Sequence, residues 1–178
     1  MGTDHRAMWA AHADPFTAMV ERVEDWEAAS PCEGWSATDV LDHVVETQRD
    51  FFAGHGVDLP AAEGGPPSRW VAHETAVRDL VGDDALMTTQ FESPFGPLAL
   101  GEALRMFYGF DLIVHRWDIA RSQGWDEQLT EAELDEIDTA VDGFGEMAYA
   151  PGIFDGPLST TEGADRQSIV LARVGRAA

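Results

Sequence analysis

The chain has 178 residues, of which 44% are hydrophobic and 25% charged, and its formal net charge is −22 at pH 7. This length suits one soluble domain with a single hydrophobic core, which we assign to residues 1–178. So acidic a surface repels nucleic acid and anionic lipid. We therefore expect a small-molecule substrate, with no nucleic acid and no membrane among the partners.

Cys32 is the only cysteine, so neither an internal disulfide nor a zinc site built from several cysteines can form. The first 30 residues contain acids and histidines in place of the apolar core of a secretion signal. No apolar run reaches the length of about 18 residues that indicates a membrane-spanning helix. We expect a cytoplasmic protein.

Apolar residues at helical spacing predict a first helix over residues 6–28, most regular after Pro15. Ser36 has the chemistry of a helix N-cap, and the second helix that starts there carries His43 in line with its apolar face. The stretch 54–68 is rich in Gly and Pro and has no period, which indicates a surface crossover. Such a crossover lets the third helix, which ends near Gly82, run parallel to the second.

The most apolar helix of the sequence is predicted from about Leu98 to Ser122. Apolar side chains occupy nearly all of its faces, so it should be the most buried helix. A short extended segment at 87–91 and a turn at 93–97 precede it, and Gly124 suits its C-terminal cap.

Thr130 begins a capping pattern for the next helix, which continues toward Tyr149. Residues 151–157 should be irregular, and residues 164–174 predict a short last helix. The whole pattern predicts an all-α protein, a four-helix bundle with one or two additional short helices.

Two polar residues interrupt the most apolar helix. Asp111 and His115 are four residues apart, so they lie one turn above the other on the same face. An ionised Asp among apolar neighbours is costly unless a metal, a cation or hydrogen bonds compensate its charge. His43 from the second helix can join them, which gives two imidazoles, one carboxylate and an open fourth position, as in catalytic zinc sites. An ordinary buried hydrogen-bond network of the same residues is the competing interpretation.

Two acidic residues near these histidines could also take part in the site, although the sequence supports this less strongly. Asp118, one turn past His115, could orient that imidazole by accepting a hydrogen bond, or could pair with Arg121 or Arg22. Glu46, one turn after the histidine of the second helix, could be a base beside a metal or a plain solvated acid.

Five further residues carry separate expectations. Arg116 and Arg121 could hold a substrate carboxylate, although arginines on a helix are more often surface charges. Cys32 precedes a helix N-terminus, where a thiol can be activated, but a packed, inert thiol is the commoner case. Trp125 is expected to be exposed and could support a homodimer. His73 is expected to be exposed on the third helix.

Three motifs carry a resemblance to a known family, at residues 31–36 (PCEGWS), 39–44 (DVLDHV) and 111–121 (DLIVHRWDIAR). The sequence resembles the DinB-like metal-binding superfamily, and within it the actinobacterial branch related to the metal-binding domain of mycothiol-dependent maleylpyruvate isomerase. The end of the chain, at residues 154–157, 165–167 and 174–176, is similar to many members of this branch.

The resemblance implies a DinB-like bundle that binds a divalent metal, zinc first and nickel second, through His43, Asp111 and His115. It also implies a transferase or isomerase of low-molecular-weight thiols, with mycothiol as the cosubstrate. The isomerase has Glu in place of Asp111 and an additional C-terminal domain, so its own reaction is not implied. A metal-dependent hydrolase that uses bound water and a non-catalytic metal- or ligand-binding protein remain the alternatives.

Overall fold

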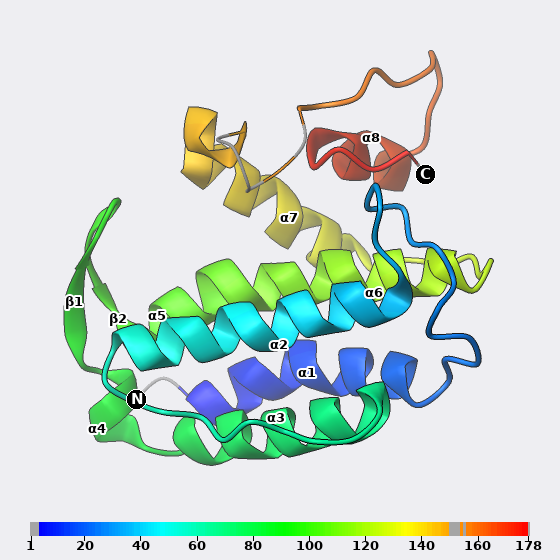
Figure 1. The fold of residues 1–178 in the computed structure, drawn as a ribbon. Helices are drawn as coiled ribbons and strands as arrows, with labels where there is room; N and C mark the ends of the chain where they lie inside the picture. Colours follow the sequence, from blue (N-terminus) through cyan, green and yellow to red (C-terminus); the bar gives the residue numbers. More distant parts are fainter. Residues whose placement is uncertain (1–3, 150–153, 155, 178) are drawn as a thin grey trace.

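The structure is a computed structural model that describes residues 4–149, 154 and 156–177. Within these residues the regular elements are helices, apart from one small hairpin (Figure 1). The elements are α1 (His5–Val20), α2 (Ala37–Gly54), α3 (Pro66–Leu80), α4 (Asp84–Met87), β1 (Gln90–Ser93), β2 (Gly96–Ala99), α5 (Leu100–Ala103), the π-helical η1 (Leu104–Gly109), α6 (Phe110–Ser122), α7 (Glu131–Phe144), the 3₁₀ turn η2 (Gly145–Tyr149) and α8 (Arg166–Arg173). The predicted all-α class is confirmed.

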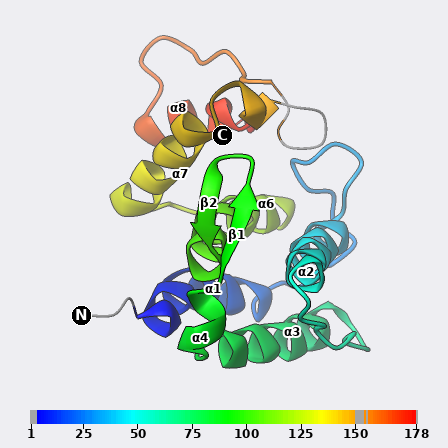
Figure 2. The ribbon, with the colours of Figure 1, turned by 90° about the vertical axis from the view of Figure 1, so that its left-hand side faces the viewer.

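Four helices form the bundle, since α1 and α2 each pack against both α3 and α6. The crossover after α2 lets α3 run parallel to α2, as predicted (Figure 1). On the opposite side of α6, α7 packs against α6 and α8 packs against α7. Figure 2 shows α7 and α8 on one side of α6 and the other three bundle helices on the opposite side.

The position of α6 between these two groups explains its composition. Leu112 and Ile119 belong to the core shared with α1, α2 and α3, whereas Ile113 and Trp117 belong to a second core shared with α7 and α8. Every residue from Leu112 to Ala120 is buried. The prediction of a most buried helix, apolar nearly all round, is confirmed for α6.

The N-terminus of α2 is fixed by the predicted cap. The Ser36 hydroxyl accepts the N–H of Asp39, and the Asp39 carboxylate accepts the N–H of Ser36 at 2.8 Å. Such a reciprocal pair satisfies two backbone donors that have no partner inside the helix. The cap sets the start of α2, so that His43 faces α6.

The first helix is shorter than predicted, because α1 runs through Pro15 but ends at Val20. Three of the next five residues, Glu21, Glu24 and Asp25, are acidic, and negative charge is unfavourable at a helix C-terminus. The Asp25 carboxylate accepts the N–H of Glu27, and the Trp26 carbonyl accepts the N–H of Thr38. Residues 21–36 are therefore a loop that packs on the start of α2.

The helix predicted from Leu98 is divided in the structure. Leu98 belongs to β2, where it pairs with Phe91, and the helix begins at Leu100. Residues 104–109 are π-helical, and the wider turn shifts the face presented by the residues before it. Leu104 therefore lies in the core, whereas Phe107 lines a cavity.

Smaller differences lie at the ends of elements. Met87 closes the short helix α4, so the expected extended segment begins only at Gln90, and the expected turn is the tip of the hairpin. Gly124 has φ +73°, as its role after the C-cap requires. Most of the segment predicted to be irregular, residues 151–157, lies outside the described residues.

His73 was predicted to be exposed, and this is wrong. Its side chain is buried between α2 and α3, with Nε2 2.9 Å from Oε1 of Gln48. None of the described helices is long and apolar enough to cross a membrane.

Candidate metal centre

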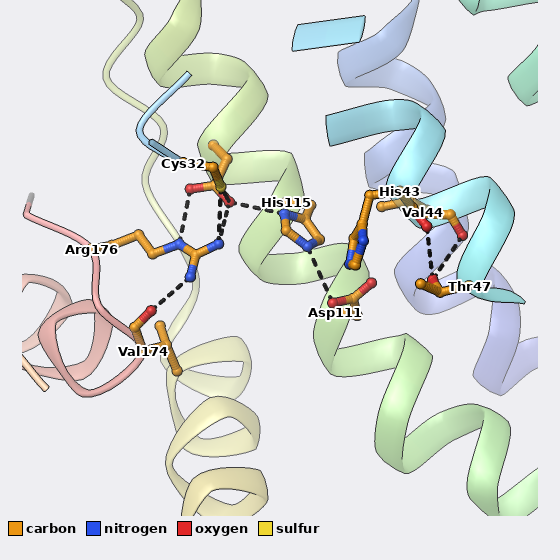
Figure 3. A network of polar contacts seen from close by, with 9 residues as sticks. Cys32, His43, Val44, Thr47, Asp111, His115, Val174 and Arg176 are labelled. Carbon is orange, nitrogen blue, oxygen red and sulfur yellow. Dashed lines mark hydrogen bonds and ion pairs between the residues drawn. The ribbon is translucent and has the colours of Figure 1, made fainter. Parts of the chain in front are cut away.

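His43, Asp111 and His115 converge between α2 and α6. One ring nitrogen of each histidine and one carboxylate oxygen of Asp111 all lie within 4.8 Å of one another. His115 Nε2 is 3.3 Å from Asp111 Oδ1, and the two imidazole centroids are 5.1 Å apart. Figure 3 shows His43 reaching from α2 toward the other two residues on α6. The structure therefore brings together the three residues that the sequence proposed as a group.

The orientation of His115 is fixed by Asp118. His115 Nδ1 is 2.9 Å from Oδ2 of Asp118, which is fully buried. Because a carboxylate only accepts hydrogen bonds, Nδ1 carries a proton and donates it to Asp118. The other ring nitrogen, Nε2, faces Asp111 and His43. Arg176 donates to both oxygens of Asp118, at 3.2 and 2.8 Å. Burial opposes ionisation, but the hydrogen bond from His115 and the charge of Arg176 outweigh it and lower the pKa of Asp118 to about 2.

The charges at the centre are linked. Burial disfavours a charge on either residue, yet the mutual attraction of Asp111 and His115 lowers the pKa of Asp111 and raises the pKa of His115 well above its usual value. Burial and the neighbouring His115 lower the pKa of His43. The neutral His43 imidazole therefore offers a free lone pair beside an ion pair.

The carboxylate of Asp111 is only half satisfied. Its Oδ1 faces His115, whereas its Oδ2 is buried and has no hydrogen-bond partner among the described residues. A buried charged oxygen without a partner is costly. Two imidazole nitrogens and a carboxylate oxygen are donors that a divalent metal such as zinc accepts. These residues therefore fit a metal, which would satisfy the free oxygen.

The three residues lie on the wall of one open cavity of about 870 Å³. Its volume falls within the range of about 300–1,000 Å³ that is usual for small-molecule sites. The ring of Trp35 packs against His43, with centroids 5.0 Å apart. A ligand in the cavity can therefore reach the side of the cluster that the protein leaves open.

Two residues of this wall received no site role, or only an uncertain one, from the sequence. Cys32 is half-buried and its Sγ lies 3.4 Å from Asp118 Oδ2 and 3.3 Å from Arg176 Nη2. Cys32, His115 and Asp118 form a second group of possible ligands whose atoms also lie within 4.8 Å of one another. In the sequence, Arg176 was noticed only because residues 174–176 are similar to the end of related chains. That similarity predicted no function for its side chain.

Arg116 and Arg121 had two interpretations, a partner for a substrate carboxylate or a surface charge, and the structure places neither at the cavity. Arg116 is buried and forms ion pairs with Glu133 at 2.6 Å and Glu127 at 2.9 Å, away from the cavity. Arg121 is exposed, with its guanidinium carbon 5.6 Å from the ring centroid of Trp117. Neither lies on the cavity wall.

The remaining candidates lie outside the centre. Glu46 is exposed and does not line the cavity. Of its two interpretations, a base beside a metal or a solvated acid, the structure supports the solvated acid. Asp118 pairs with Arg176 in addition to His115, and not with Arg121 or Arg22. Trp125 was expected to be exposed but is half-buried, with the guanidinium of Arg22 over its ring, and the homodimer stays a prediction.

An α-helical bundle in which two imidazoles and a carboxylate from facing helices meet beside a cavity is the architecture expected of DinB-like proteins. Residues 5–79 match the family model of the mycothiol maleylpyruvate isomerase N-terminal domain. The resemblance inferred from the sequence is thus confirmed over this part of the chain, which contains His43. Asp111 and His115 lie beyond it. Comparisons with curated proteins and with solved structures gave no match.

Proposed function

We propose that the protein binds a divalent metal, zinc first and nickel second, through His43, Asp111 and His115. The observation that carries the proposal is Oδ2 of Asp111, which is buried without a partner beside two imidazoles. The hydrogen bond from His115 to Asp118 supports it, because histidine ligands of metals commonly donate their second N–H to a carboxylate.

We further propose that the protein is an enzyme of low-molecular-weight thiols. A bound metal supplies a Lewis acid that lowers the pKa of a thiol and makes it nucleophilic at neutral pH. The name of the family that residues 5–79 match points to mycothiol as this thiol. The cavity has room for a thiol and an electrophile together. The reaction class is S-transfer to an electrophilic carbon, or isomerisation by addition and elimination of the thiol.

The metal proposal is tested by elemental analysis of protein purified without a histidine tag. We expect about one zinc per chain, and loss of that zinc in His43→Ala and His115→Ala. His55→Ala is the matched control, because His55 lines the same cavity outside the cluster. Unchanged metal content in either ligand variant would reject the assignment.

The thiol proposal is tested separately, with the zinc-loaded protein, mycothiol and monochlorobimane. We expect a fluorescent conjugate to form faster than without protein, and the rate to fall to background in His115→Ala. Glutathione and cysteine serve as comparison thiols. Stoichiometric zinc with no conjugate from any thiol would refute the transferase and leave the hydrolase or the non-catalytic protein.

A further inference from the structure

Beyond the polar cluster, the cavity has walls made of aromatic side chains from separate elements. Phe95 from the hairpin tip, Phe107 from η1 and Phe144 from α7 contact one another, with each pair of ring centroids 5.8–5.9 Å apart. Phe110 and Phe154 extend this group, which we call the distal aromatic wall. Figures 1 and 2 show the hairpin that supplies Phe95 rising from one end of the bundle, with its tip toward the level of α7.

A second aromatic group lines the same cavity. Phe51 lies 4.6 Å from His55 and 5.0 Å from Tyr108, and Phe91 of the hairpin lies 4.4 Å from His55, between ring centroids. Most of these rings are half-buried rather than buried, and Phe95 is 41% exposed. Their apolar faces therefore remain in contact with water, and an apolar ligand would remove them from it.

The charges of the cavity oppose an anionic ligand. Arg176 carries the one permanent positive charge among the described residues of the wall. Both its Nε and Nη2 donate to Asp118 and its Nη1 donates to the carbonyl of Val174, so its charge is already neutralised. Glu33 and Asp111 also line the cavity, and the whole chain has a formal net charge of −22. An anion would therefore meet repulsion, because among the described residues of the wall Arg176 and His115 are already paired with Asp118 and Asp111.

We infer that the cavity binds an uncharged aromatic molecule, which lies against the distal aromatic wall with its reactive end toward His43, Asp111 and His115. The inference rests on the proposed function only where it says that the end of the ligand near these three residues is the one that reacts. Aromatic side chains favour such ligands through offset and edge-to-face ring contacts. The described residues of the wall include no Arg or Lys that is free to pair with a dicarboxylate, so we place the selectivity in the aromatic walls.

The experiment uses the full chain without metal and the neutral fluorescent probe N-phenyl-1-naphthylamine. We expect saturable binding with one probe per chain. We also expect 1-acetylnaphthalene, which is neutral, to displace the probe at a concentration at least tenfold lower than 1-naphthoate does. Maleate should not displace it. Equal displacement by the neutral and anionic naphthalenes, or no probe binding, would overturn the inference.

A pair of variants locates the probe. Phe95→Ser should weaken probe binding by about threefold or more, since an aromatic contact is lost. Ile169→Ser is the control, because Ile169 is similarly exposed, at 46%, but lies on α8 outside the cavity. Equal affinities for the two variants would contradict the assignment to this wall.

The result does not depend on metal binding. Probe binding in a chain that takes up no zinc would leave this inference standing and refute only the proposed function. Stoichiometric zinc without probe binding would refute this inference and leave the proposed metal site standing.

Discussion

The two oxygens of Asp111 have different surroundings, and this difference is the strongest local indication of a ligand. Oδ1 faces His115 Nε2, which a simple ion pair explains, but Oδ2 is buried without any partner among the described residues. A hydrogen-bond network that existed only for stability would be expected to satisfy both oxygens. A metal held between Asp111, His43 and His115 would do so.

Substitution of this carboxylate separates the two explanations. Asp111→Asn keeps the shape but removes the charge, and we expect zinc affinity to fall by more than the roughly 10–100-fold that loss of an outer hydrogen-bond partner causes. Asp111→Glu retains a carboxylate and should keep stoichiometric zinc. Zinc affinity is measured by competition with a chelator. Glu46→Gln is the control, since Glu46 is exposed, and an Asn variant as tight as the unmodified protein would show that Asp111 is not a ligand.

At the scale of elements, the sequence predicts those features of a helix that depend on residues close together in the chain. The cap at Ser36 and the periodicity of α6 are local, and both were predicted. The π-helical turn was not predicted. Residues 104–109 are largely apolar, so the spacing of apolar residues does not reveal that one turn contains an additional residue. Arg176 was missed because its partner Asp118 lies 58 residues away, so the pair depends on tertiary packing alone.

The π-helical turn packs against α1. An added Cβ at Gly109 would lie 3.1 Å from the ring of His12, which is itself held by Glu136 at 2.9 Å and by the carbonyl of Met8. The imidazole therefore has little room to move. The glycine allows η1 to pack against α1 at this point, directly before the helix that carries Asp111.

Gly109→Ala should lower the free energy of unfolding by about 1–3 kcal/mol, the usual effect of overpacking. The control is Gly143→Ala in α7, where an added Cβ meets nothing within 4 Å. That change should raise stability by up to about 1 kcal/mol, because alanine favours the helix. Urea unfolding measures both, and a Gly109→Ala protein as stable as the Gly143→Ala protein would contradict the close-packing explanation.

At the scale of the whole molecule, the four-helix bundle holds a buried polar pair that is separate from the metal centre. His73 lies in the interface of α2 and α3, with Nε2 near Gln48 and Nδ1 without a partner among the described residues. Burial, with a smaller contribution from the charge of Arg49, lowers the pKa of His73 from 6.5 to about 4. The imidazole is therefore neutral in the folded protein across most of the acidic range.

This shift gives the stability of the molecule a definite pH dependence. Between pH 6.5 and about 4 the unfolded chain binds a proton at His73 that the folded chain does not, so the free energy of unfolding falls as the pH falls through this window. The full loss is about 3 kcal/mol, since one pKa unit corresponds to about 1.4 kcal/mol. His73→Gln removes this contribution, so urea unfolding at pH 7.5, 6 and 5 should show a steeper decline for the unmodified protein than for the variant. Parallel declines would mean that His73 is protonated alike in both states, which burial between α2 and α3 does not allow.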